Sequence, residues 1–154
     1  MLVVLLTSGC AVRLHTPVAD NKDARLAAAQ EQLVHLTDPI DKSRTYTSIA
    51  DMELNLAVDA AQAGDLGKMT ALLQDYDSAI QGSRDSLIQS PRKLKASPYR
   101  DFEIALRTQL RILKSLSNSL TFDQREPVTA TIEKAAAIRE QIFRLLFPKV
   151  ALAR

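Results

Sequence analysis

The sequence is poor in the residues that build most catalytic and metal-binding sites. It has one cysteine, two histidines and no tryptophan, and aromatic residues make up 5% of its 154 positions. A single cysteine excludes an internal disulfide framework. His15 and His35 have no cysteine or carboxylate at the spacing of metal ligands. We therefore expect neither a structural disulfide nor a metal site.

Phosphate-binding loops and a strong net charge are missing as well. Of the four glycines, Gly64 and Gly67 flank an expected helix start and do not form a glycine-rich loop after a strand. The net charge is only +2, from 20 basic and 18 acidic residues, so no overall field attracts nucleic acid. We expect no cofactor, no small-molecule substrate and no nucleic-acid partner.

The residues that are abundant favour a helical globular domain. Hydrophobic residues make up 46% of the chain and charged residues 25%, which is an ordinary globular composition. Many alanines, leucines, glutamines, arginines and lysines, with few glycines and prolines, favour helix. We expect an all-α fold, an antiparallel bundle of four long helices plus a shorter N-terminal helix. This single domain covers residues 21–148, and a flexible tail follows over residues 149–154.

Apolar residues at helical spacing predict five helices. They cover residues 21–36, 41–63, 66 to beyond 80, 98–120, and from 125 or 126 to 147. Asp38-Pro39 ends the first helix, and a loop over residues 90–97 separates the third from the fourth. An alternative start for the last helix is a capping box from Asp123 to Glu126. The expected core contains Met52, Leu56, Leu73, Tyr76, Phe102, Leu106, Leu110, Ile132 and Ile142.

The clearest turn signal is Gly64-Asp65. Glycine suits the left-handed conformation in which helices often end, and aspartate suits the cap of the next helix. The two flanking helices should therefore form a tight antiparallel hairpin. This hairpin is similar to one unit of a tetratricopeptide array, although the array's period of about 34 residues does not recur along the chain.

Two sets of residues are candidates for partner contacts. Leu54, Val58, Ile104 and Ile112 lie off the main apolar stripes, so they mark either a second packed side or an exposed partner surface. Arg92, Lys93 and Lys95 form a basic loop, which either contacts phosphate or an acidic partner or is a solvated connection.

Five acidic residues on the second and third helices are the only candidates for acid–base chemistry. They are Asp51, Glu53, Asp59, Asp75 and Asp77, and they could supply paired carboxylates. Charged residues on amphipathic helices usually form the solvated face. We therefore expect no catalytic residue and no enzymatic activity.

Residues 6–10, Leu-Thr-Ser-Gly-Cys, place three small residues before the sole cysteine. This stretch resembles the lipobox of bacterial lipoproteins. The resemblance implies that residues 1–10 are a leader and acylation site, that residues 1–9 are removed, and that Cys10 carries the lipid. Residues 11–20, which contain Pro17, then read as a tether. In the alternative, Cys10 is a free cysteine that packs as a small apolar group.

The lipobox resemblance implies a protein of the bacterial cell envelope that is anchored in a membrane and faces the periplasm. Ala11 stands where lipoproteins kept at the inner membrane have an aspartate, so the resemblance favours the outer membrane. The expected function is a non-catalytic helical interaction or structural module with an unidentified envelope protein as partner. A soluble cytoplasmic helical adaptor is the alternative.

Overall fold

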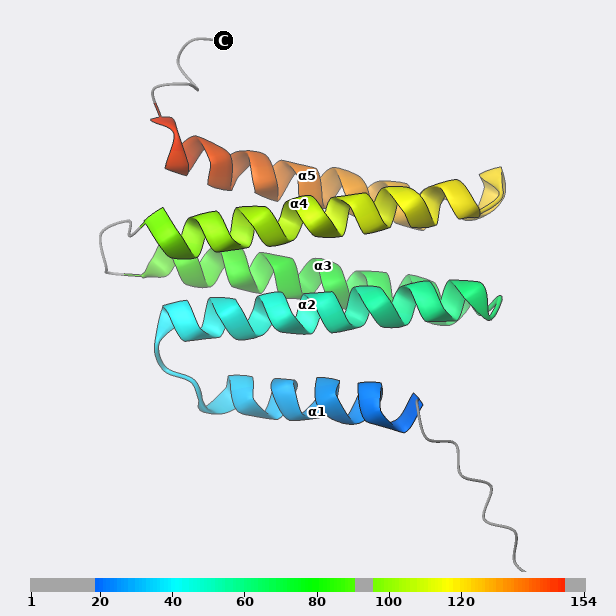
Figure 1. Cartoon of the computed structure of the whole chain (residues 1–154), viewed down its shortest axis with the longest axis horizontal. Helices are drawn as coiled ribbons and strands as arrows, with labels where there is room; N and C mark the ends of the chain where they lie inside the picture. The colour runs from blue at the N-terminus through cyan, green and yellow to red at the C-terminus, as the bar shows by residue number, and fades with distance from the viewer. Residues whose placement is uncertain (1–18, 91–95, 149–154) are drawn as a thin grey trace, which may run out of the picture.

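The computed structural model of the protein describes residues 19–90 and 96–148, and these ranges contain helices and no strand (Figure 1). The expected all-α fold is confirmed, with a shorter helix in front of four long ones. The elements are α1 (Ala19–His35), α2 (Pro39–Gln62), α3 (Leu66–Gln89), α4 (Ala96–Ser119), the 3₁₀ turn η1 (Phe122–Gln124) and α5 (Glu126–Leu146).

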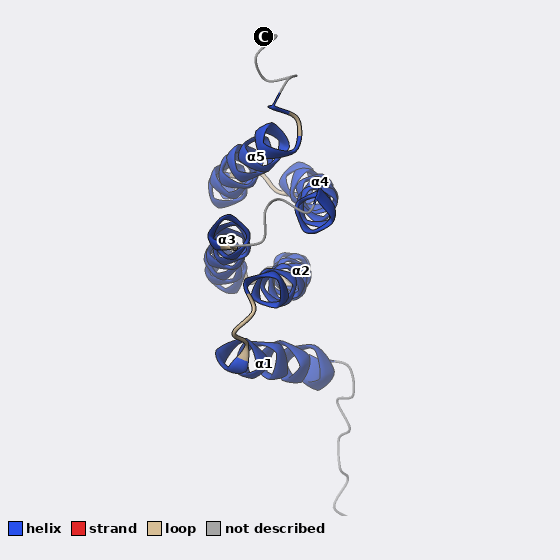
Figure 2. Cartoon of the chain, turned by 90° about the vertical axis from the view of Figure 1, so that its left-hand side faces the viewer, coloured by secondary structure: helices blue, strands red, loops and turns tan. Residues whose placement is uncertain are grey.

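The four long helices form two stacked hairpins. Helices α2 and α3 are antiparallel neighbours, as are α4 and α5, and the second hairpin lies on the first so that α2 contacts α4 and α3 contacts α5. The end-on view shows these two pairs, with α1 lying obliquely across the outer side of the first hairpin (Figure 2). Helix α1 packs on α2. Successive helices are therefore antiparallel, while the main contacts between the hairpins, α2 with α4 and α3 with α5, join parallel helices.

The core runs through both hairpins. Seven of the nine expected core residues are buried, and the remaining two, Met52 and Ile132, are partly buried and pack against the core. The seven are Leu56, Leu73, Tyr76, Phe102, Leu106, Leu110 and Ile142. Apolar stripes at helical spacing therefore locate the core correctly, because each long helix turns one face inward.

The connection between α1 and α2 is shorter than the sequence pattern suggests. Asp38 acts as the N-cap of α2, and its carboxylate Oδ1 accepts from the backbone N–H of Ile40 at 2.8 Å and of Asp41 at 3.3 Å. Pro39 occupies the first turn, where its missing N–H leaves no hydrogen bond unmade. The Asp38-Pro39 pair thus begins α2 and does not merely end α1. Helix α1 itself starts at Ala19, two residues before the expected position.

The turn between α2 and α3 has the predicted chemistry. Gly64 has a φ of 78°, in the left-handed region that glycine adopts without a steric penalty. Asp65 then caps α3 by accepting at Oδ1 from the backbone N–H of Lys68 at 2.9 Å. The predicted glycine end and aspartate cap are both confirmed.

The last helix starts at Glu126, with Pro127 in its first turn. The alternative capping box from Asp123 to Glu126 does not form, because the chain makes the turn η1 just upstream. In that turn the Gln124 side chain accepts from the backbone N–H of Thr121 at 3.3 Å. The same kind of local side-chain bond therefore forms two residues earlier than expected. The expected flexible tail, residues 149–154, lies outside the described residues.

Helices α2 and α3 approach closely where small residues meet. The Ser43 and Ser83 hydroxyl oxygens are 2.8 Å apart across the interface, and the Ser83 hydroxyl also donates to the Ser43 carbonyl at 3.0 Å. One residue before Ser83, a Cβ placed on Gly82 would lie 2.7 Å from the Tyr46 ring. Gly82 is therefore needed for the close approach of Tyr46, which explains a glycine within a long helix.

We expect Gly82→Ala to destabilise the protein by up to about 2 kcal/mol. The overpacking against Tyr46 costs about 1 to 3 kcal/mol, and the better helix propensity of alanine offsets about 1 kcal/mol of it. In a Tyr46→Ala background the clash is absent, so the same substitution should stabilise the protein. Urea denaturation of the two single variants and the double variant measures this reversal of sign.

Gly67→Ala provides the matched control. Gly67 lies in the same helix, and the nearest atom to an added Cβ is Asp65 Oδ1 at an ordinary 3.7 Å. This substitution should leave stability unchanged or raise it by up to about 1 kcal/mol in both backgrounds. Equal effects of the two glycine substitutions would show that the Tyr46 contact is not the reason for Gly82.

Of the two alternatives for the apolar residues off the main stripes, a second packed side holds for three of the four. Leu54 is fully buried, and Val58 and Ile112 are partly buried and packed against the core, so these residues mark second-side packing. The reason is the stacking of the hairpins, since α2 and α4 each contact neighbours on more than one side. Only Ile104 is exposed, at 48%.

Candidate functional site

Several sequence candidates lie outside the described residues. These are Cys10 with its lipobox-like stretch, His15, and the basic loop residues Arg92, Lys93 and Lys95. The other histidine, His35, is exposed at the end of α1. Residues 19–90 and 96–148 contain no group of three or more potential metal ligands. Among these same residues, no helix is both long and apolar enough to span a bilayer.

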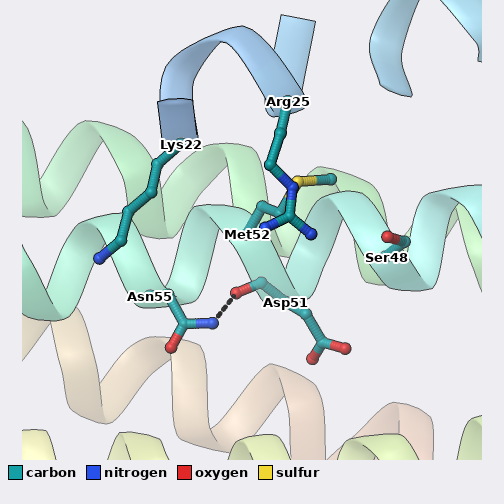
Figure 3. Close-up of a pocket in the computed structure, with 6 residues that line it drawn as sticks. All are labelled: Lys22, Arg25, Ser48, Asp51, Met52 and Asn55. Atoms are coloured by element: carbon teal, nitrogen blue, oxygen red, sulfur yellow. Dashed lines mark hydrogen bonds between the residues drawn. The ribbon is translucent and has the colours of Figure 1, made fainter. Parts of the chain in front are cut away.

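A shallow groove of about 480 Å³ lies between α1 and α2. Figure 3 shows Lys22 and Arg25 of α1 reaching over α2, while the Asp51 carboxylate points away from both of them. Lys22 makes an ion pair with Asp59, which lies two turns beyond Asp51 on α2. The groove is lined by Lys22, Arg25, Ser48, Asp51, Met52 and Asn55. Its lining combines two cations, Lys22 and Arg25, with the Asp51 carboxylate and neutral polar groups, and it holds no nucleophile paired to a base.

Helix α1 is the most loosely packed of the five helices. Among its described side chains, residues 21–35, none is fully buried, and Leu26, Ala29 and Leu33 reach only partial burial against the core. Val34 is 80% exposed. The groove is therefore bounded on one side by a helix with little buried apolar surface to hold it.

A chain of polar side chains runs from the bundle interior to the exposed Asp51 and joins three helices. The hydroxyl of Tyr76 on α3 donates to Gln109 Oε1 on α4 at 3.1 Å, and Gln109 Nε2 donates to Asp51 Oδ1 on α2 at 2.6 Å. Tyr76 and Gln109 are fully buried. Burial, followed by the charges of Asp77 and Asp51, raises the pKa of Tyr76. Burial also raises the pKa of Asp51 against the opposing effect of the Gln109 hydrogen bond.

Glu103 is a buried acid with two arginine partners. Its Oε2 accepts from Arg107 Nη2 at 2.5 Å, one turn along α4, and its Oε1 accepts from Arg139 Nε of α5 at 2.8 Å. Burial by itself raises the pKa of Glu103, but the hydrogen bonds and charges of the two arginines outweigh it, so the pKa is lowered overall. Glu103 is therefore a fixed anion that joins the two helices of the second hairpin.

Asp77 joins the two hairpins. Its Oδ2 accepts from Lys134 Nζ of α5 at 2.7 Å, and its other oxygen, Oδ1, is buried without a hydrogen-bond partner. The Asp77 side chain is 7% exposed, whereas that of Lys134 is 53% exposed. Asp77 therefore depends on this one ammonium group for the compensation of its buried charge.

We expect Lys134→Met to destabilise the protein by about 2 kcal/mol. Leaving a buried carboxylate unpaired costs about 3 to 5 kcal/mol, and the exposure of Lys134 to water reduces that figure. Adding Asp77→Asn removes the unpaired charge and should restore part of the loss. Arg144→Met, which breaks an exposed pair with Glu140, is the control and should change stability by less than about 1 kcal/mol. A double-mutant cycle with no coupling between Asp77 and Lys134 would contradict this account.

Among the described residues, Glu53 is the carboxyl group whose pKa is shifted most. It is 3% exposed, and its Oε2 has no hydrogen-bond partner. Burial, with a smaller contribution from the negative charge of Asp75, raises the pKa of Glu53 from its ordinary 4.5 to about 7. The expectation that the acids of α2 and α3 form a solvated face is therefore wrong for Glu53 and Asp77, since both lie at the core positions of their helices.

The chemistry of these acids is structural in this conformation. A carboxyl group with a pKa near neutrality suits general acid–base catalysis, but Glu53 is closed to water and to any substrate. Asp77 and Glu103 are tied to cations, and Asp51 is held by Gln109. Glu53 and Asp75 are close enough to interact electrostatically, but Asp51 and Asp59 line separate grooves.

Comparison with known protein families, curated proteins and solved structures finds no match for this chain. The function is therefore argued from the chain's own residues.

Proposed function

We propose that this protein is a membrane-anchored lipoprotein of the bacterial cell envelope, whose helical domain acts as a non-catalytic interaction or structural module. The observation that carries the proposal is the lipobox-like stretch at residues 6–10, with Cys10 as its acceptor. The diacylglyceryl group of such lipoproteins meets the need for more than one acyl chain in stable anchoring.

The start of the folded domain is compatible with an anchor at Cys10. Helix α1 begins at Ala19, so residues 11–18 separate it from the acylation site. Eight residues span at most about 28 Å when fully extended. The bundle would therefore stay close to the membrane surface, and Ala11 favours the outer membrane by resemblance.

The features of the domain suit a module that binds or supports another protein. Two of its buried acids, Asp77 and Glu103, are used in cross-links between helices, and large apolar side chains remain exposed at its ends. Phe122 in η1 is 86% exposed and Val34 is 80% exposed. Exposed aromatic side chains are frequent anchors in protein interfaces. The partner is proposed to be another envelope protein.

Detergent phase partition of the protein expressed from its full reading frame in a bacterial host tests the proposal. Wild type should enter the detergent phase and remain with membranes through a high-salt wash. Cys10→Ser should move to the aqueous phase, because it has no thiol to acylate. His15→Ala, a change in the tether that leaves Cys10 intact, should behave as wild type. Recovery of wild type in the aqueous cytoplasmic fraction would instead support the soluble adaptor.

A further inference from the structure

A stripe of basic residues runs along the outer face of α4. It consists of Arg100, Arg107, Arg111 and Lys114, and all four are exposed. At 3.6 residues per turn these positions fall within an arc of about 60° and extend over about 21 Å of helix. The buried side of the helix, which includes Leu106 and Leu113, lies about 110° to 130° around the helix from the centre of this arc. The small net charge of the chain therefore hides a concentrated local charge.

Most of the charge on this stripe is not neutralised by neighbours. Arg107 pairs with Glu103, which shares its charge with Arg139. Within the part of the chain that the structure describes, Arg100, Arg111 and Lys114 make no ion pair. The one exposed acid among the described residues of α4 is Asp101, which lies away from the stripe on the helix. The face is thus positive along its length.

One apolar side chain belongs to the same face. Ile104 is 48% exposed and lies between Arg100 and Arg107 at the edge of the stripe. The stripe has no aromatic residue on which nucleic-acid bases could stack. Basic residues around an exposed aliphatic side chain suit the headgroup region of a bilayer, where cations meet phosphate and the apolar group enters the boundary with the acyl chains.

The position of α4 relative to the start of α1 agrees with a bilayer on the α4 side of the molecule. Figure 2 shows that α1 begins on the same side of the molecule as α4, to the right in that view. The buried residues of α4 face the bundle interior, whereas the four residues of its basic stripe are exposed to solvent. A membrane that holds a lipid on Cys10 would thus lie within reach of this side.

We propose that the basic stripe of α4 docks on the surface of an anionic phospholipid bilayer. This inference rests on the proposed function for the presence of a membrane, and it adds the orientation of the bundle on that membrane. Each lysine or arginine near an anionic surface raises membrane partitioning by about fivefold at physiological salt. Anchor and stripe together would hold the bundle on its side, with α4 against the headgroups.

Vesicle flotation of the full chain carrying Cys10→Ser tests the stripe without the anchor. The vesicles contain phosphatidylcholine alone or phosphatidylcholine with phosphatidylglycerol. The protein should bind only the phosphatidylglycerol vesicles, and less tightly as salt is raised. Arg100→Gln/Arg111→Gln/Lys114→Gln should lower the partition coefficient by about 10- to 100-fold. These three residues are chosen because none makes an ion pair that supports the fold, and circular dichroism confirms that the variant is helical.

A charge-matched variant shows whether position matters. Arg44→Gln/Lys68→Gln/Arg144→Gln removes three exposed cations from other helices and should keep most of the binding. Equal loss in the two triple variants, or equal binding to both kinds of vesicle, would overturn the proposal. Binding of a single-stranded oligonucleotide at a salt concentration that abolishes vesicle binding would instead assign the stripe to nucleic acid. Because Cys10 is absent throughout, these outcomes are independent of whether the native chain is acylated.

Discussion

Leu73→Ala should lower the free energy of unfolding by about 2 to 5 kcal/mol. Leu73 lies in the N-terminal half of α3, is 1% exposed and belongs to the core that joins the two hairpins. Removing its side chain loses the apolar transfer free energy and leaves a cavity that close-packed helices fill only in part. The midpoint of urea denaturation, followed by circular dichroism, measures the loss.

Two further leucines calibrate this result. Leu110→Ala, at a position that is 9% exposed on α4, should also fall within the range of about 2 to 5 kcal/mol. Leu145→Ala removes the same atoms from a position that is 41% exposed and should change stability by less than about 1 kcal/mol. Denaturation midpoints unchanged by Leu73→Ala and Leu110→Ala would mean that these helices do not share the described core.

Glu53→Gln should stabilise the protein above neutral pH by about 3 kcal/mol and leave it unchanged at acidic pH. Burial raises the pKa of Glu53 from 4.5 to about 7, so the folded protein binds a proton between these pH values that the unfolded chain has released. Stability therefore falls as pH rises through this window. Glutamine mimics the protonated carboxyl group at every pH and should remove the fall.

The difference in stability between wild type and Glu53→Gln isolates the contribution of Glu53. Glu103 acts in the opposite direction, because its pKa is lowered and its stabilisation is lost on acidification, but wild type and variant share this contribution. Glu133→Gln, a change on the exposed surface of α5, serves as the control. If the difference in stability between wild type and Glu53→Gln stays constant across the window, Glu53 does not titrate as a buried acid.

Helix positions and most of the core follow from the sequence because they depend on local signals. Asp65 beside Gly64 specifies a turn through backbone chemistry alone, and the apolar stripe of each helix shows which face is buried. The start of α2 was harder to predict, since Asp38-Pro39 satisfies the rules for a helix end and for a helix start. The hydrogen bonds of the Asp38 carboxylate decide between them.

The buried polar groups were missed although a signal was present. Gln109 stands within the spacing of Phe102, Leu106, Leu113 and Leu116, and a polar residue within an apolar stripe is a candidate for burial with a partner. Glu53 interrupts the buried stripe of α2 in the same way. The partners of Gln109 could not be predicted, because Asp51 and Tyr76 reach Gln109 only through the stacking of one hairpin on the other.

The stacking of the hairpins also explains why the apolar residues off the main stripes do not form an exposed partner surface. Residues at the side of a helical stripe are exposed in an isolated hairpin and buried when a second hairpin covers them. Leu54 and Ile112 lie on helices that contact each other between the hairpins, whereas the four residues of the basic stripe on α4 are exposed. The exposed chemistry of the domain is therefore mainly electrostatic on α4 and aromatic at Phe122.

Intact-mass spectrometry of the protein expressed from its full reading frame tests the central claim most directly. The account predicts a mature chain that begins at Cys10 and carries the mass of a diacylglyceryl group, with or without a further acyl chain on the new amino terminus. The Cys10→Ser chain should keep residues 1–9 and carry no lipid. A wild-type chain with an intact Met1 and an unmodified Cys10 would contradict the anchor and favour the soluble helical adaptor.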